Sequence, residues 1–219
     1  MLLNSPVAGT VYGVILNDGA SVQALGALDA APYKGAPKAP VLYIKPANTH
    51  VASGSVVTLP QGAQAVEVGA SLGLVLGRAA SRVPQEQALA QVQGLVLAAD
   101  LSLPHASYYR PAIREKCFDG ALPLAVLQRG MPDEQALAAI TLVTEIDGQE
   151  VERRCLGDWL RGPAQLLAEV SDWMTLQAGD VLLLGVRYQA AQARAGSHVR
   201  VHAEGLGSVE FTLAAAEAA

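Results

Sequence analysis

The charged side chains that follow Asp100 are the part of the sequence best suited to chemistry on a carboxylate substrate. Arg110, Arg114 and Lys116 lie within residues 101–120, a long stretch rich in polar and aromatic residues. Arginine suits bidentate recognition of a carboxylate, and a lysine ammonium can neutralise the charge of an enolate. A loop of this length in a compact domain is usually functional, so we expect it to line a binding site.

Other reactive side-chain types have simpler interpretations. His105, in the same stretch, could act as a base, but an exposed loop histidine is the favoured interpretation. Cys117 could be a reactive thiol beside Lys116, but a small packed side chain is favoured. We expect His198 and His202, near the carboxy terminus, to be structural.

The composition excludes several classes of function. With a net charge of −5 and no cluster of Lys and Arg, the chain has nothing to hold a nucleic-acid backbone. The apolar runs 72–76 and 95–99 are too short to span a bilayer, and residues 1–9 lack the pattern of a signal peptide. We therefore expect a cytoplasmic protein without nucleic-acid or membrane partners, and two cysteines fit a reducing compartment.

The hydrophobic pattern predicts one domain dominated by strands. Hairpins are predicted over residues 139–154 and 198–213, each around a turn that contains glycine. Apolar residues at helical spacing predict an amphipathic helix over Pro163–Trp173, with Trp173 in the core. Residues 20–33 form either a short helix or a loop. Further strands are predicted over residues 11–16, 41–44, 55–59, 66–76, 94–99 and 181–185.

From Val41 onward, an ordered set of short motifs resembles the fumarylacetoacetate hydrolase family. Residues 43–49 read Tyr-Ile-Lys-Pro-Ala-Asn-Thr, similar to the family's Tyr-Ile-Lys-Pro-x-Asn-Thr. Residues 116–119, Lys-Cys-Phe-Asp, are similar to its Lys-x-Phe-Asp, and residues 176–185 to its Leu-x-x-Gly-Asp-x-Ile-x-x-Gly run. No single motif is decisive, so the resemblance rests on the order of the whole set.

Residues 108–111, Tyr-Tyr-Arg-Pro, and the pattern Arg114-x-Lys116-x-x-Asp119-Gly120 narrow this resemblance. They are similar to the family's two-half isomerase/decarboxylases of 4-hydroxyphenylacetate (homoprotocatechuate) breakdown, at the amino-terminal half. The resemblance implies a mainly β (α+β) fold, a mixed β-sandwich or β-roll with a few short helices, usually dimeric. It implies one domain over 1–219, with a variable amino-terminal or lid region over 1–40 and a core over 41–213.

The resemblance also implies a chemistry and the residues that perform it. Family members bind a divalent cation and a 2-oxo acid or its enol. They stabilise enolate-like carbanions while a C–C bond breaks or a proton moves. Carried over by position, Lys116 and Arg110 are the expected catalytic residues. The expected binding residues for a small dicarboxylate are Lys45, Asn48, Tyr109, Arg114 and Asp119, the last of which we expect to pair with a cation.

The metal site is where the sequence departs most from the family pattern. The family's Glu-x-Glu places two carboxylates on one face of a strand, and an Asp from the next strand completes a site for Mg²⁺ or Mn²⁺. Those two positions are Gly69 and Ser71 here. Glu67 lies a further ~6.5 Å along the strand, too far to substitute, and we expect it to be a surface charge. Asp100 remains, either as a turn residue at the end of a strand or as a weak metal ligand, so we expect the metal to bind weakly or not at all.

Two further family elements are absent, and two functional interpretations stay open. The first histidine is His50 and the first glutamate Glu67, so no His-x-x-Glu acid/base pair precedes Lys45. Val186 replaces the threonine that holds the substrate carboxylate in the family. The chain is therefore either a lyase/isomerase subunit for an unsaturated dicarboxylic 2-oxo acid, or a catalytically degenerate structural or regulatory subunit. In either case we expect a homodimer or a heterodimer with a same-fold partner, which the second interpretation requires to be metal-competent.

Overall fold

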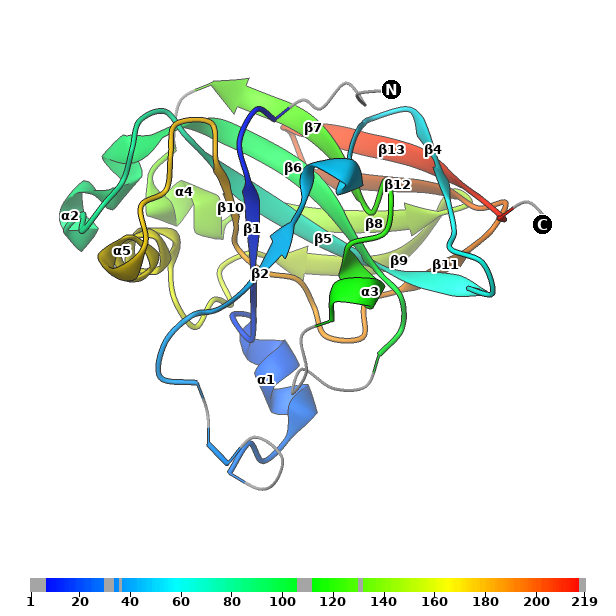
Figure 1. Cartoon of the computed structure of the whole chain (residues 1–219), viewed down its shortest axis with the longest axis horizontal. Helices are drawn as coiled ribbons and strands as arrows, with labels where there is room; N and C mark the ends of the chain where they lie inside the picture. The colour runs from blue at the N-terminus through cyan, green and yellow to red at the C-terminus, as the bar shows by residue number, and fades with distance from the viewer. Residues whose placement is uncertain (1–6, 30–33, 36, 106–111, 130–131, 217–219) are drawn as a thin grey trace.

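Two β-sheets pack against each other and carry short helices at their margins (Figure 1). The computed structural model describes residues 7–29, 34–35, 37–105, 112–129 and 132–216. In the described chain, the larger sheet has eight strands, in the order β2-β1-β10-β5-β6-β7-β3 with β11 paired to β5. The smaller has five, in the order β4-β13-β12-β8-β9.

The strands are β1 Val11–Ile15, β2 Val41–Lys45, β3 His50–Ala52, β4 Ser55–Thr58, β5 Ala65–Leu76, β6 Val92–Ser102, β7 Leu122–Arg129, β8 Thr141–Ile146, β9 Gln149–Cys155, β10 Val181–Leu183, β11 Gln192–Arg194, β12 His198–Ala203 and β13 Gly207–Ala214. Most neighbours are antiparallel, but β1 with β10, β3 with β7 and β4 with β13 are parallel. The mainly β fold with few short helices is therefore confirmed, as are both predicted hairpins.

The helices are short: α1 Gly19–Leu25, α2 Gln85–Ala88, α3 Ile113–Lys116, α4 Glu134–Ala138 and α5 Pro163–Trp173, with 3-10 turns η1 Ala47–Thr49 and η2 Leu89–Gln91. The predicted helix α5 is confirmed, and it buries Leu166, Leu167 and Val170. The prediction for Trp173 is wrong, because this last residue of the helix is 58% exposed. No helix in the described ranges is long and apolar enough to cross a membrane.

The large sheet is strongly curled, because its two end strands are close neighbours in the sequence. β2 and β3 lie at opposite ends of the strand order, yet only residues 46–49 separate them along the chain. So short a connection requires the sheet to bend until its ends approach each other. The curl carries the end of β2 to the end of β6, where Lys45 meets Asp100.

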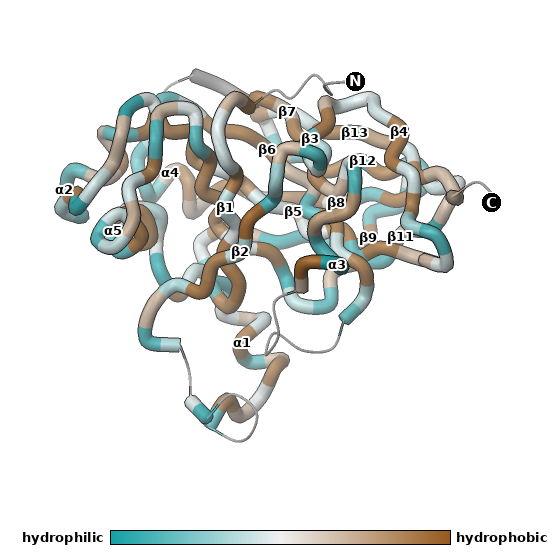
Figure 2. The backbone as a smooth tube through the Cα atoms, viewed as in Figure 1, coloured by the Kyte–Doolittle hydropathy of each residue, from teal (hydrophilic) through white to brown (hydrophobic). Residues whose placement is uncertain are grey.

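The two central strands, β5 and β6, present different residues on their two faces, because strand side chains alternate. One face, with Val68, Leu72 and Leu97, joins the main core between the sheets. Figure 2 shows many hydrophobic segments, in brown, along the strands. The other face is apolar near Val96 and becomes polar toward Asp100. β6 continues to Ser102, so Asp100 lies inside a strand and the predicted strand end at this residue is wrong.

Candidate active site

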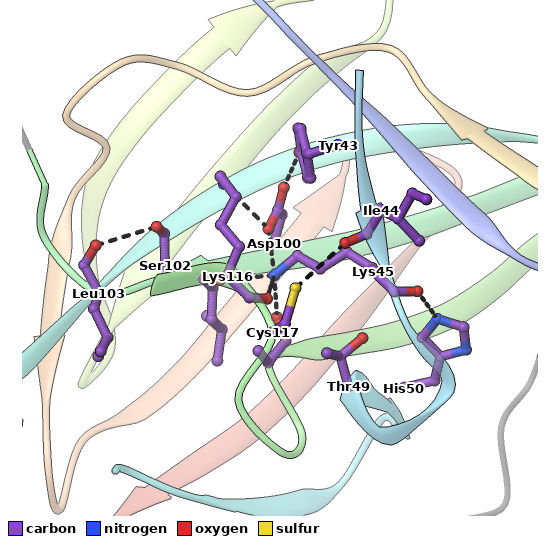
Figure 3. A network of polar contacts seen from close by, with 12 residues as sticks. Tyr43, Ile44, Lys45, Thr49, His50, Asp100, Ser102, Leu103, Lys116 and Cys117 are labelled. Carbon is purple, nitrogen blue, oxygen red and sulfur yellow. Dashed lines mark hydrogen bonds and ion pairs between the residues drawn. The ribbon is translucent and has the colours of Figure 1, made fainter. Parts of the chain in front are cut away.

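Lys45 and Asp100 form a buried ion pair where β2 meets β6 (Figure 3). Lys45 Nζ lies 2.7 Å from Asp100 Oδ1, and neither side chain is exposed to solvent. Lys45 Nζ also donates hydrogen bonds to the carbonyl oxygens of Leu101 at 2.8 Å, Lys116 at 2.7 Å and Ala121 at 3.0 Å. Because an ammonium carries three protons, these carbonyls use all of them. The contact with Oδ1 is therefore one of charge, without a directed hydrogen bond.

Lys116 and Tyr43 complete the cluster around Asp100. Lys116 Nζ lies 3.6 Å from Asp100 Oδ1 and 4.5 Å from the centroid of the Tyr43 ring, where a cation–π contact is favourable. The Tyr43 hydroxyl donates to Asp100 Oδ2. Gly13 leaves room for this ring, since a Cβ there would lie 2.0 Å from Tyr43 Cζ. One carboxylate thus faces two ammonium groups and a phenol.

The ionisation of this cluster follows from burial and charge. Burial alone would raise the pKa of Asp100, but the charges of Lys116 and Lys45 outweigh it and hold that pKa below its ordinary value. Burial lowers the pKa of Lys45 to about 8, against the attraction of Asp100. At neutral pH Asp100 and Lys45 are therefore both ionised, and their charges offset each other. The ammonium of Lys116 remains as the positive charge of the cluster.

Glu67 lies on the same sheet face and is part of this site, contrary to the expectation of a surface charge. Its cross-strand partner is Ser102, one step along the strands from the Gly69–Asp100 pair. The side chain is half-buried, and burial raises its pKa while the charge of Lys116 opposes the rise. The alternation of strand residues could have identified it, because Glu67 shares a face with Gly69.

The other sequence-predicted residues have different roles in the structure. Asn48 donates to Asp119 Oδ1 at 2.7 Å and to the Cys117 carbonyl at 3.0 Å, which joins η1 to the turn after α3. Within the described chain Asp119 has no ion pair, and its pairing with a cation stays a prediction because Arg110 lies outside the described residues. Arg114 is exposed on α3. Tyr109 and Arg110 lie outside the described residues.

His105 and Cys117 are more enclosed than their positions in a polar loop suggest. His105 is partly buried, and its Nδ1 lies 3.3 Å from Ser102 Oγ and 3.1 Å from the Leu103 carbonyl. Cys117 Sγ lies 3.4 Å from the Ile44 carbonyl (Figure 3), and burial raises the pKa of its thiol. A raised pKa disfavours the thiolate, so the packed interpretation of Cys117 is supported.

The two positions where the family pattern has metal-binding glutamates are closed by other groups. A Cβ at Gly69 would lie 2.8 Å from Val186 Cγ1 and 3.0 Å from the carbonyl oxygen of Asp100. Ser71 Oγ donates to the Gly185 carbonyl at 3.0 Å. Among the residues that the structure describes, no group of three or more His, Cys, Asp or Glu is arranged to hold a metal ion.

A buried arginine fills a gap in the sheet beside these positions. Between β10 and β11 the segment 184–191 leaves the sheet, so part of the edge of β5 is unpaired there. Arg154 Nη2 donates to the carbonyls of Ala70 at 3.0 Å and Gly185 at 2.8 Å, and Nη1 lies 3.1 Å from Asp18 Oδ2. Arg154 therefore donates hydrogen bonds to backbone oxygens that receive none from a neighbouring strand.

The sequence matches the family described as fumarylacetoacetate (FAA) hydrolase, C-terminal, over residues 10–214. This chain belongs to the fumarylacetoacetate hydrolase family. It is 38% identical over 203 residues to the 4-hydroxyphenylacetate degradation bifunctional isomerase/decarboxylase of Salmonella dublin. It is 37% identical over 206 residues to the homoprotocatechuate catabolism bifunctional isomerase/decarboxylase of Escherichia coli. Each alignment covers 92% of this chain and 46% of the relative, so the chain spans about half the length of these relatives.

Solved structures share the fold of this chain. The 5-carboxymethyl-2-hydroxymuconate delta-isomerase of Mycobacterium smegmatis has a TM-score of 0.82 at 25% identity, covering 97% of this chain and 79% of that one. Fumarylpyruvate hydrolase of Pseudomonas aeruginosa, solved with Mn²⁺ and pyruvate, has a TM-score of 0.79 at 20% identity, covering 97% and 91%. The second likeness shows the fold alone.

The donors present at the family's metal position do not fit a divalent cation. Mg²⁺ and Mn²⁺ favour sites with several oxygen ligands. Gly69 and Ser71 provide no carboxylate, and both oxygens of Asp100 face proton donors or ammonium groups. A metal ion on Asp100 Oδ1 would meet the Lys45 ammonium, which lies 2.7 Å from that oxygen.

Proposed function

We propose that this chain is a lyase or isomerase subunit that acts on an unsaturated dicarboxylic 2-oxo acid in 4-hydroxyphenylacetate (homoprotocatechuate) catabolism. The supporting observation is the cluster of Lys116, Asp100 and Tyr43, in a chain 38% identical to an isomerase/decarboxylase of that catabolism. The two candidate reactions are decarboxylation of 5-oxopent-3-ene-1,2,5-tricarboxylate and isomerisation of 2-hydroxyhepta-2,4-diene-1,7-dioate.

Lys116 supplies the positive charge that an enolate requires. Loss of CO₂, or of a proton, next to the 2-oxo group leaves negative charge on the enolate oxygen. Lys116 is only 5% exposed, so its ammonium acts in a medium that screens charge poorly. Tyr43 and Asp100 fix its position, and Lys45 offsets the charge of Asp100. The carboxylate therefore orients Lys116 without cancelling its charge.

Glu67 is the described carboxyl group best suited to move the proton. Because burial raises its pKa, it exchanges a proton nearer neutral pH than an ordinary glutamate. In the isomerisation, Glu67 would accept the proton of the 2-hydroxyl group as the carbonyl forms, and then deliver a proton to the carbon chain. Glu67 thus regains its starting protonation state, so the proton count of the site is unchanged after each turnover.

In this proposal, Mg²⁺ or Mn²⁺ binds this chain weakly or not at all. Its support is the pairing of Asp100 with two lysines, together with Gly69 and Ser71 at the ligand positions. The ammonium of Lys116 would then provide the charge stabilisation that a cation provides in metal-dependent relatives.

A second candidate function is that of a non-catalytic subunit that supports a metal-competent partner of the same fold, as a homodimer or heterodimer. The observation that favours it is Val186, which replaces the carboxylate-binding threonine of the family and fills the space above Gly69. The relatives contain about twice this chain's length, enough for two such halves.

Turnover by the purified chain in EDTA, with 2-hydroxyhepta-2,4-diene-1,7-dioate followed by ultraviolet absorbance, tests the enzyme proposal. We expect turnover in the wild type, a fall in kcat of about 10²–10³ in Lys116→Met, and no change in Lys38→Met, an exposed lysine outside the site. Turnover that appears only after a metal-competent partner is added would favour the second candidate. Full activity of Lys116→Met would contradict the assigned role of this lysine.

A further inference from the structure

A polar cavity of about 680 Å³ lies at the start of β5, beside Ala65, and the residues assigned to the proposed reaction do not line it. Its walls come from the turn between β4 and β5, the end of β6, α3 and β11. Two arginines, Arg114 and Arg194, line it together with the glutamines Gln61, Gln64 and Gln192.

The strand register connects this cavity to the candidate active site. Asp100 pairs with Gly69, while Ser102 and Gln192 flank Glu67 on either side. The next pair on the same face is Ala65 with Arg194. Cross-strand partners share a face of the sheet, so a continuous row leads from Asp100 past Glu67 to Arg194. The ends of the row, at residues 69 and 65 of β5, are about 13 Å apart by strand rise.

The charge of the cavity favours an anion. Arg153, Arg154, Arg161 and Arg200 each form an ion pair. Over the described ranges, Arg114 and Arg194 form none, like Arg78, Arg82 and Arg187, but these two border the same cavity. Glu115 is the carboxylate that also lines the cavity. The formal charge of Arg114, Arg194 and Glu115 together is therefore +1.

The surrounding groups favour a carboxylate over other anions. The three glutamine amides can donate hydrogen bonds, and the planar guanidinium matches the two oxygens of a carboxylate. α3 is fixed to the end of β6 by the hydrogen bond from Leu103 N to the Glu115 carbonyl at 2.8 Å. The backbone that carries Arg114 is therefore held at this wall.

We infer that this cavity binds the remote carboxylate of an extended dicarboxylic substrate, and that Arg194 is a specificity-determining residue for it. The inference rests on the proposed function only in placing the 2-oxo end beside Lys116. A short oxo acid held at Lys116 would leave the arginines unpaired, because the row separates them. A diacid of about seven carbons, extended along Glu67, would present its second carboxylate to Arg114 and Arg194.

Calorimetric titration with two unreactive probes tests this inference without turnover. Heptanedioate carries a carboxylate at each end and heptanoate carries one. We expect the wild type to bind heptanedioate at least about tenfold more tightly, the difference that one charge-assisted contact supplies. Arg194→Gln should remove this preference, and Arg194→Lys should retain part of it. Arg82→Gln, an exposed arginine outside the cavity, should leave it intact.

The outcomes separate this inference from the proposed function. Equal binding of the two acids by the wild type, or an unchanged preference in Arg194→Gln, would overturn the carboxylate site, whatever the enzymatic assay shows. A preference lost in Arg194→Gln supports the site even if the chain alone turns over no substrate. Circular dichroism of each variant establishes that the loss does not come from unfolding.

Discussion

Val186 fills the space that any side chain at position 69 would need, with Cγ1 2.8 Å and Cβ 2.9 Å from the ideal Cβ position. Glycine at 69 and valine at 186 are therefore complementary in volume. A glutamate returned to position 69 alone would collide with Val186 and with the carbonyl oxygen of Asp100. Gly69 and Val186 thus form a packed arrangement that a glutamate at position 69 alone would disrupt.

A double-mutant cycle measures this complementarity. Gly69→Ala should lower the free energy of unfolding by about 1–3 kcal/mol, the usual cost of overpacking. Val186→Ala removes the closest of the two obstructing groups, so the double mutant should lose less than the sum of the single mutants. Urea denaturation gives each value. Strict additivity would show that the two residues do not compete for the same space.

The stability of the protein should depend on Lys45 in the alkaline range. Its pKa is about 8 in the fold and 10.5 in the unfolded chain, so between these values the unfolded state binds more protons and stability rises with pH. As pH rises from about 8 to 10.5, the free energy of unfolding of the wild type should therefore rise by on the order of 2–3 kcal/mol relative to that of Lys45→Met. Urea unfolding of both proteins across this window measures the difference. Parallel curves would show that the Lys45 ammonium is not destabilised by burial.

The pairing of Arg154 with Asp18 should be essential to the fold. Arg154→Met leaves Asp18 and two backbone carbonyls without this donor, which should cost about 3–5 kcal/mol. Arg153→Met is the matched control, because Arg153 is the neighbouring residue in the sequence. Its side chain is exposed, so its ion pairs should contribute little to stability. Thermal unfolding compares the two variants. Similar losses in both would mean that the buried network does not carry the stability assigned to it.

Metal binding should be weak. One carboxylate, already paired with Lys45, is a poor site for Mg²⁺ or Mn²⁺. Calorimetric titration of the purified chain with either ion should give no binding at micromolar concentrations. Micromolar binding that disappears in Asp100→Ala would contradict this expectation and restore Asp100 as a ligand.

Local patterns predicted the elements whose residues repeat with a regular period. The helix Pro163–Trp173 and the two hairpins follow from such repeats and from glycine turns. β7 was missed, and it contains Pro123, which cannot donate a ladder hydrogen bond. Pro123 is accommodated because it lies in the part of β7 that pairs with β3. The pairing of β7 with β6 begins only at Leu124.

The candidate site was predictable in its members but not in its geometry. The family motifs pointed to Lys45, Asp100 and Lys116, yet nothing in the sequence shows that the first two touch across 55 positions. That contact depends on the curl of the whole sheet. The positions of Glu67, and of Arg194 in the proposed carboxylate site, depend on strand register, which a single sequence does not fix.

The three carbonyls that surround Lys45 Nζ also bear on how fast the protein folds and unfolds. They belong to Leu101, Lys116 and Ala121, so the ammonium is bonded 56, 71 and 76 positions along the chain. Because these contacts are non-local, we expect the ammonium to enter its place after the rate-limiting step of folding. Interactions formed that late govern the unfolding rate rather than the folding rate. We therefore expect a substitution at Lys45 to change the unfolding rate, and with it the lifetime of the native state, more than the folding rate.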